Sequence, residues 1–236
     1  MKPPAMTAVA DARTAFACAV RLAAASRLEP DLLADIPAVP LTARDLLHLG
    51  RHDAFRRPFM AAAARKAGWE GIGRADCARL TETPQGRLAM LVASAPPAEI
   101  RQAARIVASA VLHKHVLAAT GKEERQRLRL ALGTLCFQIA TREAPTLHAG
   151  LALLDPRDGA AAALLDPDAG NASAALEKAG YGVLAAFLLH EASPLARLFA
   201  LRHGESPGQP LPSEQQVSAL VKLLRRRMPE WSAIIG

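Results

Sequence analysis

The sequence predicts an all-α protein, a multi-helix globular bundle whose connectors are irregular and rich in proline and glycine. Alanine and leucine dominate the composition, and aromatic residues make up only 4% of it. This composition favours helices, because alanine and leucine lose little entropy in a helix, whereas strands prefer β-branched and aromatic side chains. The chain has 236 residues, of which 51% are hydrophobic, and this is enough to bury a substantial core.

Apolar residues recur with the 3.6-residue period of an α-helix, and this period predicts nine helices in chain order. They span residues 7–27, 42–49, 53–67, 84–94, 97–119, 122–142, 172–190, 193–203 and 213–227. Pro96 and Pro97 mark the start of the fifth helix, because proline in the first turn sacrifices no backbone hydrogen bond. Glu99 then lies favourably near the positive end of the helix dipole. Gly121 separates this helix from the next, and we expect the two to pack as a central hairpin.

Within this hairpin the period also predicts which side chains face inward. In the helix over 97–119, the inward residues are Ile100, Ala103, Ala104, Val107, Ala110 and Val111. In the helix over 122–142, they are Leu128, Leu132, Leu135 and Ile139, with Lys122, Gln126 and Arg129 facing outward.

The segment over 153–171 contains the string LLDP twice, at a spacing of eleven residues. A duplicated acidic motif would bind a cation, but turn chemistry explains the same residues as two Asp-Pro turns around a short alanine helix. We therefore expect an N-terminal helical body over 1–152, a connector over 153–171 and a C-terminal helical region over 172–236, packed as one unit. A second connector covers 204–213.

Cysteine spacing and hydropathy indicate a cytoplasmic protein. Cys18, Cys77 and Cys136 are far apart, so neither a disulfide framework nor a CxxC metal site is expected. Charged residues interrupt the N-terminal apolar runs before a signal-peptide core can form. The apolar stretch VLAAFLL at 183–189 is far shorter than the roughly 20 residues of a membrane span.

The string FALRHGES at 199–206 resembles the signature of the phosphoglycerate mutase and histidine phosphatase family. In that chemistry His203 would be the phosphorylated nucleophile and Arg202 a phosphate clamp, and a second histidine would have to follow. No histidine follows His203 in this sequence. We therefore interpret the string as the basic end of a helix followed by a glycine stop.

Other strings that are typical of metal or nucleotide sites also lack their partners. RHD, with His48 one turn before His52 and Asp53, is similar to the pair of all-α metal-dependent phosphohydrolases, but no second pair follows, and a role for these residues stays open. HKH places His113 and His115 two residues apart, which is off a common helix face. GWEGIG and TGKEER lack the glycine pattern of nucleotide loops. We expect no catalytic residue, cofactor or metal, with a histidine-based enzyme as an alternative.

The net charge of +7 and the pI near 9.9 allow nucleic acid, anionic lipid or an acidic protein as partner. The densest cluster of arginines lies at the end of the helix over 213–227. The opposite face of that helix is an apolar stripe of Val217, Leu220, Val221, Leu224 and Met228. Pro229 ends the helix, and the apolar turn that follows either caps the body or docks onto a partner. The candidate partner-binding residues are Lys222, Arg225, Arg226, Arg227, Trp231 and Ile234.

The C-terminal third contains AGYGVLAAFLLHEASPLARLFALRHGE, then a proline-rich break, then LVKLLRRRMPEWSAII. A helix rich in leucine and alanine leads to Pro194 and Leu198, and a Leu-Val-Lys helix closes at Met228 and Pro229. This pattern resembles the type III secretion sorting-platform accessory proteins of the YscK and OrgA kind. The stretch over 98–112 is similar to the central helix of that family.

The resemblance implies a non-enzymatic helical adaptor at the cytoplasmic face of a bacterial inner membrane, without a transmembrane segment. Its partners would be the forkhead-associated domain of the inner-membrane ring protein and the pod protein of the sorting platform. The arginines would face an acidic patch, Trp231 would pack against a partner, and nucleic acid is not expected. The alternative is a basic helical nucleic-acid-binding or regulatory protein. A DNA-binding helix-turn-helix needs a basic recognition helix after a tight turn. The helix over 213–227 has the charge, but a long connector precedes it in place of the tight turn.

Overall fold

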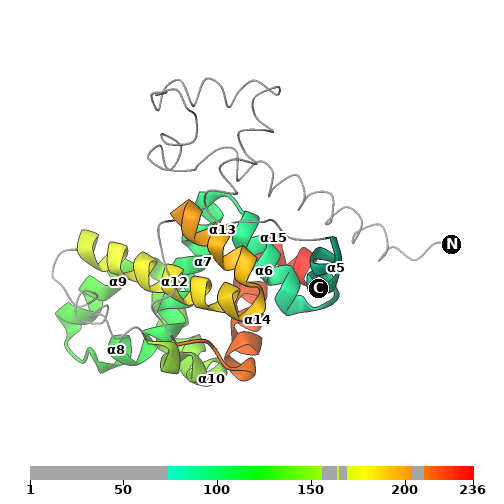
Figure 1. Cartoon of the computed structure of the whole chain (residues 1–236). Helices are drawn as coiled ribbons and strands as arrows, with labels where there is room; N and C mark the ends of the chain where they lie inside the picture. Colours follow the sequence, from blue (N-terminus) through cyan, green and yellow to red (C-terminus); the bar gives the residue numbers. More distant parts are fainter. Residues whose placement is uncertain (1–73, 156–163, 165–168, 204–209) are drawn as a thin grey trace, which may run out of the picture.

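The computed structural model describes residues 74–155, 164, 169–203 and 210–236. These residues form helices and no strand, so the predicted all-α fold is confirmed (Figure 1). The elements are α5 Arg74–Glu82, α6 Pro84–Ser94, α7 Pro97–Val111, α8 His113–Ala118, α9 Lys122–Gln138, the π-helix η1 Ile139–Glu143, α10 Ala144–Leu147, the 3-10 helix η2 Ala149–Leu154, α12 Ala169–Glu191, α13 Ser193–His203, α14 Glu214–Arg227 and α15 Pro229–Ile235. The helices predicted over 7–27, 42–49 and 53–67, and with them His48, His52 and Asp53, lie outside the described residues.

Capping residues start α6 and α14 where the sequence predicts these helices. The hydroxyl of Thr83 accepts a hydrogen bond from the backbone N–H of Gly86 at 3.0 Å, and Pro84 occupies the first helical position. Ser213 and Gln216 form a capping box, in which each side chain accepts from the backbone N–H of the other residue. These bonds satisfy backbone donors that have no partner inside the helix.

The helix predicted over 97–119 is divided into α7 and α8. Leu112 has a ψ of 10°, which is off the α-helical value, and α8 begins at the next residue. The backbone N–H of Leu112 still donates to the carbonyl of Ala108 at 2.8 Å, so α7 ends with that donor satisfied. Because neither proline nor glycine marks this break, the helical period did not predict it.

The helix predicted over 122–142 kinks at Gly133 and continues as η1. Gly133 has φ 77° and ψ 164°, a conformation that essentially only glycine adopts. Leu135, which follows the kink, is 36% exposed, and Cys136 is buried. The prediction that Leu135 faces inward was therefore wrong, because a continuous helix was assumed across the kink.

The buried hydrophobic side chains of the described residues form two clusters. The larger one, here called the large core, joins α6, α7, the second half of α12, α13, α14 and α15. Its most extensive contact is between α7 and α12, which Figure 1 shows crossing in the middle of the molecule. The two backbones are so close that a Cβ atom on Gly180 would lie 2.0 Å from the carbonyl oxygen of Ala104. The main partner of α7 is therefore α12 rather than α9, the helix that follows α7 in the expected hairpin.

The smaller cluster, here called the small core, joins the end of α7, α8, α9 and the first half of α12. It consists of Ala108, Leu112, Val116, Ala119, Leu128, Leu132, Cys136, Ala140, Leu164, Leu176 and Ala179, with Phe137 partly buried against it. Cys136 is a free, buried thiol. Only Leu128, Leu132 and Cys136 of the 17 residues in α9 are buried, so most of this helix faces outward.

Helix α12 passes through both clusters. By length and composition alone its Ala172–Glu191 portion is long and apolar enough to cross a membrane, and 61% of the tested window is buried inside the protein. The apolar stretch at 183–189, which by itself is too short for a span, is thus part of a longer helix. Because α12 packs against α6, α7, α9 and α13, it serves as the central core helix of this structure.

Candidate functional site

The C-terminal end of α14 projects cations away from the large core. Its inward face is the predicted stripe together with one more leucine, and the buried residues are Val217, Leu220, Val221, Leu223, Leu224 and Met228. Lys222, Arg225 and Arg226 are exposed, and we call these three residues the α14 cationic surface. Neither Lys222 nor Arg225 has an ion-pair partner among the residues that the structure describes. The helix dipole favours cations at this end, which accounts for part of the arginine cluster.

Arg227, the fourth predicted cation, turns back toward Glu143 of η1. One carboxylate oxygen of Glu143 accepts from Nε of Arg227 at 2.7 Å and from its Nη2. The Glu143 side chain is only 5% exposed, and a buried carboxylate is costly without such a partner. Nε of Arg226 lies 3.7 Å from the other carboxylate oxygen. The structure therefore assigns Arg227 to an ion pair within the chain rather than to a free binding surface.

His148 is buried beside the same carboxylate, with its Nε2 atom 3.7 Å from Oε1 of Glu143. Burial lowers the pKa of His148 below its ordinary value of 6.5. The negative charge of Glu143 opposes this shift, whereas the positive charges of Arg226 and Lys222 add to it. The α14 cationic surface thus lies close to a buried histidine whose neutral form is favoured.

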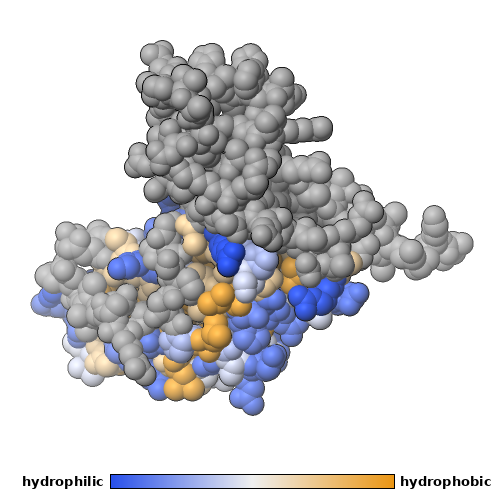
Figure 2. Space-filling model, viewed as in Figure 1, coloured by the Kyte–Doolittle hydropathy of each residue, from blue (hydrophilic) through white to orange (hydrophobic). Residues whose placement is uncertain are grey.

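A cavity of about 360 Å³ opens beside the α14 cationic surface. It is lined by Gln138, Arg142, Glu143, Thr146, Leu147, Arg226 and Arg227. Leu147 is a large apolar side chain with 56% of its surface exposed, next to these arginines. On the face that Figure 2 shows, small apolar patches lie among hydrophilic residues. The combination of exposed Leu147 with Arg142, Arg226 and Arg227 suits a protein partner that offers carboxylates around an apolar contact.

Trp231 lies in α15 and is 2% exposed. Its Nε1–H donates to Oε2 of Glu99, in the first turn of α7, at 2.8 Å. Arg87 of α6 donates from Nε and Nη2 to the carbonyl of Ile235, at 2.9 and 2.6 Å. These bonds fix α15 to the body, so Trp231 caps the large core and is not available as a partner-binding residue. Ile234, the remaining predicted contact, is 40% exposed.

Among the described residues, the histidines of the HKH string and His203 lie in separate surroundings. His113 is buried and donates from Nδ1 to a backbone carbonyl of α7, whereas Nε2 of His115 lies 2.5 Å from a carboxylate oxygen of Asp155. The ring of His203 packs against that of Phe199, with a centroid distance of 4.6 Å. In the described ranges no three His, Cys, Asp or Glu side chains come close enough to hold a metal ion.

Sequence reasoning missed Glu143 and gave Glu99 only a dipole role. Glu143 is 84 residues from Arg227, and Glu99 is 132 residues from Trp231, so no local spacing connects these pairs. The available signal for Glu143 is its position four residues after Ile139, which the period places on the inward face. A carboxylate at such a position requires a buried partner.

Comparisons of the chain with family models, with curated proteins and with solved structures gave no match. The resemblance to the YscK and OrgA proteins therefore rests on the helix and proline pattern of the C-terminal third and on the stretch over 98–112. The interpretation of the site rests on that pattern and on the geometry of its own residues.

Proposed function

We propose that this protein is a non-enzymatic helical adaptor of a bacterial type III secretion sorting platform. It acts at the cytoplasmic face of the inner membrane and links the inner-membrane ring protein to the cytoplasmic pod protein. The observation that carries this proposal is the α14 cationic surface, three exposed cations on a helix whose other face is buried in the large core. The resemblance of the C-terminal third supplies the identity of the partners.

Two features suit the α14 cationic surface to an acidic protein. The buried stripe and the Arg227–Glu143 pair hold α14 in place, so little ordering entropy is lost when a partner binds. Lys222 and Arg225 have no ion-pair partner in the described structure, so incoming carboxylates displace no existing bond. Exposed charges of this kind raise the association rate, and the apolar surface of Leu147 slows dissociation.

The test is a double charge reversal, Lys222→Glu with Arg225→Glu. We expect the association rate with the ring protein's cytoplasmic domain or with the pod protein to fall by about tenfold or more, and the loss to shrink as salt rises. Surface plasmon resonance at two salt concentrations measures both effects. The thermal stability should stay nearly unchanged, because exposed charges contribute little to it. Arg226 is left intact, since its contact with Glu143 would confound the result.

The matched control is Lys114→Glu with Arg127→Glu, which changes the net charge by the same amount on exposed residues of α8 and α9. An equal loss in the control would mean that binding follows overall charge, and the α14 cationic surface would then not be the docking site. Generic duplex DNA provides the other arm. Tight DNA binding that weakens steeply with salt, without any protein complex, would overturn the adaptor and support the nucleic-acid-binding alternative.

A further inference from the structure

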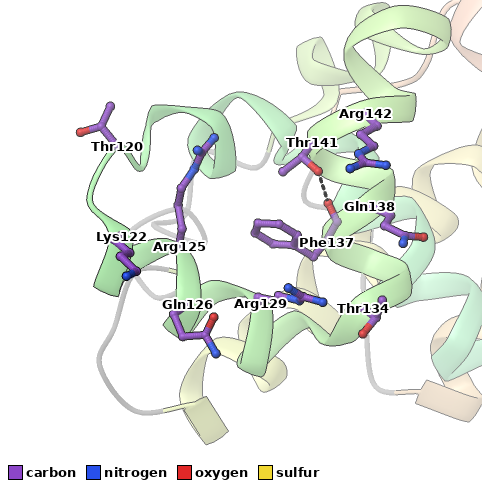
Figure 3. A pocket seen from close by; sticks show the side chains of 10 residues that line it. All are labelled: Thr120, Lys122, Arg125, Gln126, Arg129, Thr134, Phe137, Gln138, Thr141 and Arg142. Atoms are coloured by element: carbon purple, nitrogen blue, oxygen red, sulfur yellow. Dashed lines mark hydrogen bonds between the residues drawn. The ribbon is translucent and has the colours of Figure 1, made fainter.

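A second cavity, of about 630 Å³, lies between the part of α9 before the kink at Gly133 and the segment that follows the kink. It is lined by Thr120, Lys122, Arg125, Gln126, Arg129, Thr134, Phe137, Gln138, Thr141 and Arg142 (Figure 3). These residues come from both sides of the kink, so the bend in α9 creates the concave surface. The volume is within the range of small-molecule binding sites.

The bend in α9 is held in place by Arg105 of α7. Nη2 of Arg105 donates to the carbonyl of Leu132, immediately before Gly133, at 3.1 Å. Arg105 is itself positioned by Ser173 at 3.3 Å and by Glu177 at 3.7 Å, both on α12. After the kink the chain continues as η1, and short π-helical segments occur frequently at functional sites. The cavity is therefore preformed by the fold.

The lining of the cavity carries positive charge only. Its cationic side chains are Lys122, Arg125, Arg129 and Arg142, and none of the ten residues that line it is acidic. Glu123, on the same helix, lies 3.7 Å from Arg127, which does not line the cavity. Several arginine forks around one cavity suit the oxygen atoms of phosphate groups.

An aromatic ring projects into the middle of this charged lining. Phe137 is partly buried against the small core, and its ring points into the cavity between the arginine side chains in Figure 3. Its backbone carbonyl accepts a hydrogen bond from the hydroxyl of Thr141 at 2.7 Å. A base can stack on such a ring while cations hold the attached phosphates, an arrangement that proteins use for single-stranded nucleic acids.

We propose that this cavity binds a nucleoside polyphosphate, with its base against Phe137 and its phosphates held by Arg129 and the neighbouring cations. An acidic peptide would use the cations but not the ring, and a bare polyphosphate would likewise leave the ring unused. The proposal concerns a site separate from the α14 cationic surface and does not depend on the adaptor function. Arg142 lines both cavities, so it is left unchanged in the tests of both proposals.

The probes are ATP and inorganic tripolyphosphate, titrated calorimetrically into the full chain without divalent metal. Arg129→Ser should weaken the binding of both probes by about tenfold, the effect of losing roughly 1.4 kcal/mol of binding free energy. Phe137→Leu should weaken ATP several-fold and leave tripolyphosphate unchanged, because only ATP carries a base. Phe137→Tyr, which keeps the ring, should retain ATP binding and shows that any loss in the leucine variant is specific.

The matched control is Arg127→Ser, an exposed arginine of the same helix outside the cavity. Its affinity for both probes should stay within about twofold of the wild type, since it makes no contact with the site. An equal loss in this control would reveal non-specific electrostatics and overturn the proposal. ATP and tripolyphosphate binding that both ignore Phe137→Leu would exclude base recognition. Saturable binding of a polyglutamate peptide with no binding of ATP would assign the cavity to an acidic protein instead.

Discussion

The large core and the small core share α7 and α12, yet they differ in how firmly they hold the helix that packs on them, α14 on the large core and α9 on the small core. The large core holds α14 with a continuous apolar stripe and closes with Trp231 of α15. The small core holds α9 with only three buried residues of that helix. Where the apolar stripe is continuous, as in α14, the helix is regular and presents its cations on the face opposite the stripe. Where few positions of the helix are buried, as in α9, the helix bends at Gly133 and forms a concave surface.

This difference should appear in the stability of each region, because most helical stability in proteins comes from the packing of an apolar face. Helix α9 buries little apolar area, and its outward residues are mostly polar or charged. Segments with few buried apolar contacts open at lower free energy than the rest of the molecule. We therefore expect α9 to exchange its amide hydrogens before α7 and α14.

Matched leucine truncations should have the largest effects. Leu220→Ala, in the large core, should lower the free energy of unfolding by about 3–5 kcal/mol, because its surroundings cannot collapse into the void. Leu128→Ala, in the small core, should cost about 2–3 kcal/mol, because the thin layer around it can relax or admit water. Urea unfolding measures both values.

Hydrogen exchange sharpens the same comparison. Leu128→Ala should accelerate exchange mainly in α8 and α9, whereas Leu220→Ala should accelerate it throughout the described helices. Equal costs in urea and identical exchange patterns would show that the two clusters unfold as one unit, and the distinction between them would then have no energetic content.

The sequence predicted the regular region better than the bent one. The bounds of α6 and α13 and the inward stripe of α14 follow from period, proline and capping residues, all of which act within a few positions. The kink at Gly133 was missed because an isolated glycine within a helical pattern is usually tolerated.

The partners of the C-terminal side chains were missed for another reason. Trp231 and Arg227 were expected on a partner surface, but each bonds to a carboxylate far away in the chain. Pairings of this kind depend on how the helices pack, which no local pattern records. The exposed part of the candidate site, Lys222 with Arg225 and Arg226, followed directly from the helical wheel.

Gly133→Ala should have the next largest effect. A Cβ atom at this position would meet no atom within 4 Å, so the cost is conformational strain alone, about 1–3 kcal/mol. Gly150→Ala is the matched control, since its Cβ would also enter open space and its φ is not positive; its change should stay within about 0.5 kcal/mol. A straight helix would instead gain about 1 kcal/mol from the added alanine. A gain in stability would therefore contradict the kink at Gly133, and with it the concave cavity that the kink forms.

The smallest expected effect is a pH dependence of the free energy of unfolding that comes from His148, which is buried beside Glu143. Burial lowers the pKa of His148 in the folded protein, so between its ordinary value of 6.5 and the lower folded value the unfolded chain binds more protons. The contribution of His148 to stability is therefore fully present above pH 6.5 and is lost as the pH falls through this window. His148→Gln cannot titrate, so its free energy of unfolding should fall less than that of the wild type between pH 8 and pH 5, as measured by urea titrations at each pH.

Arg226→Gln, which removes one of the charges that lower this pKa, should shift the wild-type curve part of the way toward that of His148→Gln. Parallel curves for the wild type and His148→Gln would show that His148 protonates as readily in the folded chain as in the unfolded one. Burial beside Glu143 would then leave the pKa of His148 no different from that of an exposed histidine.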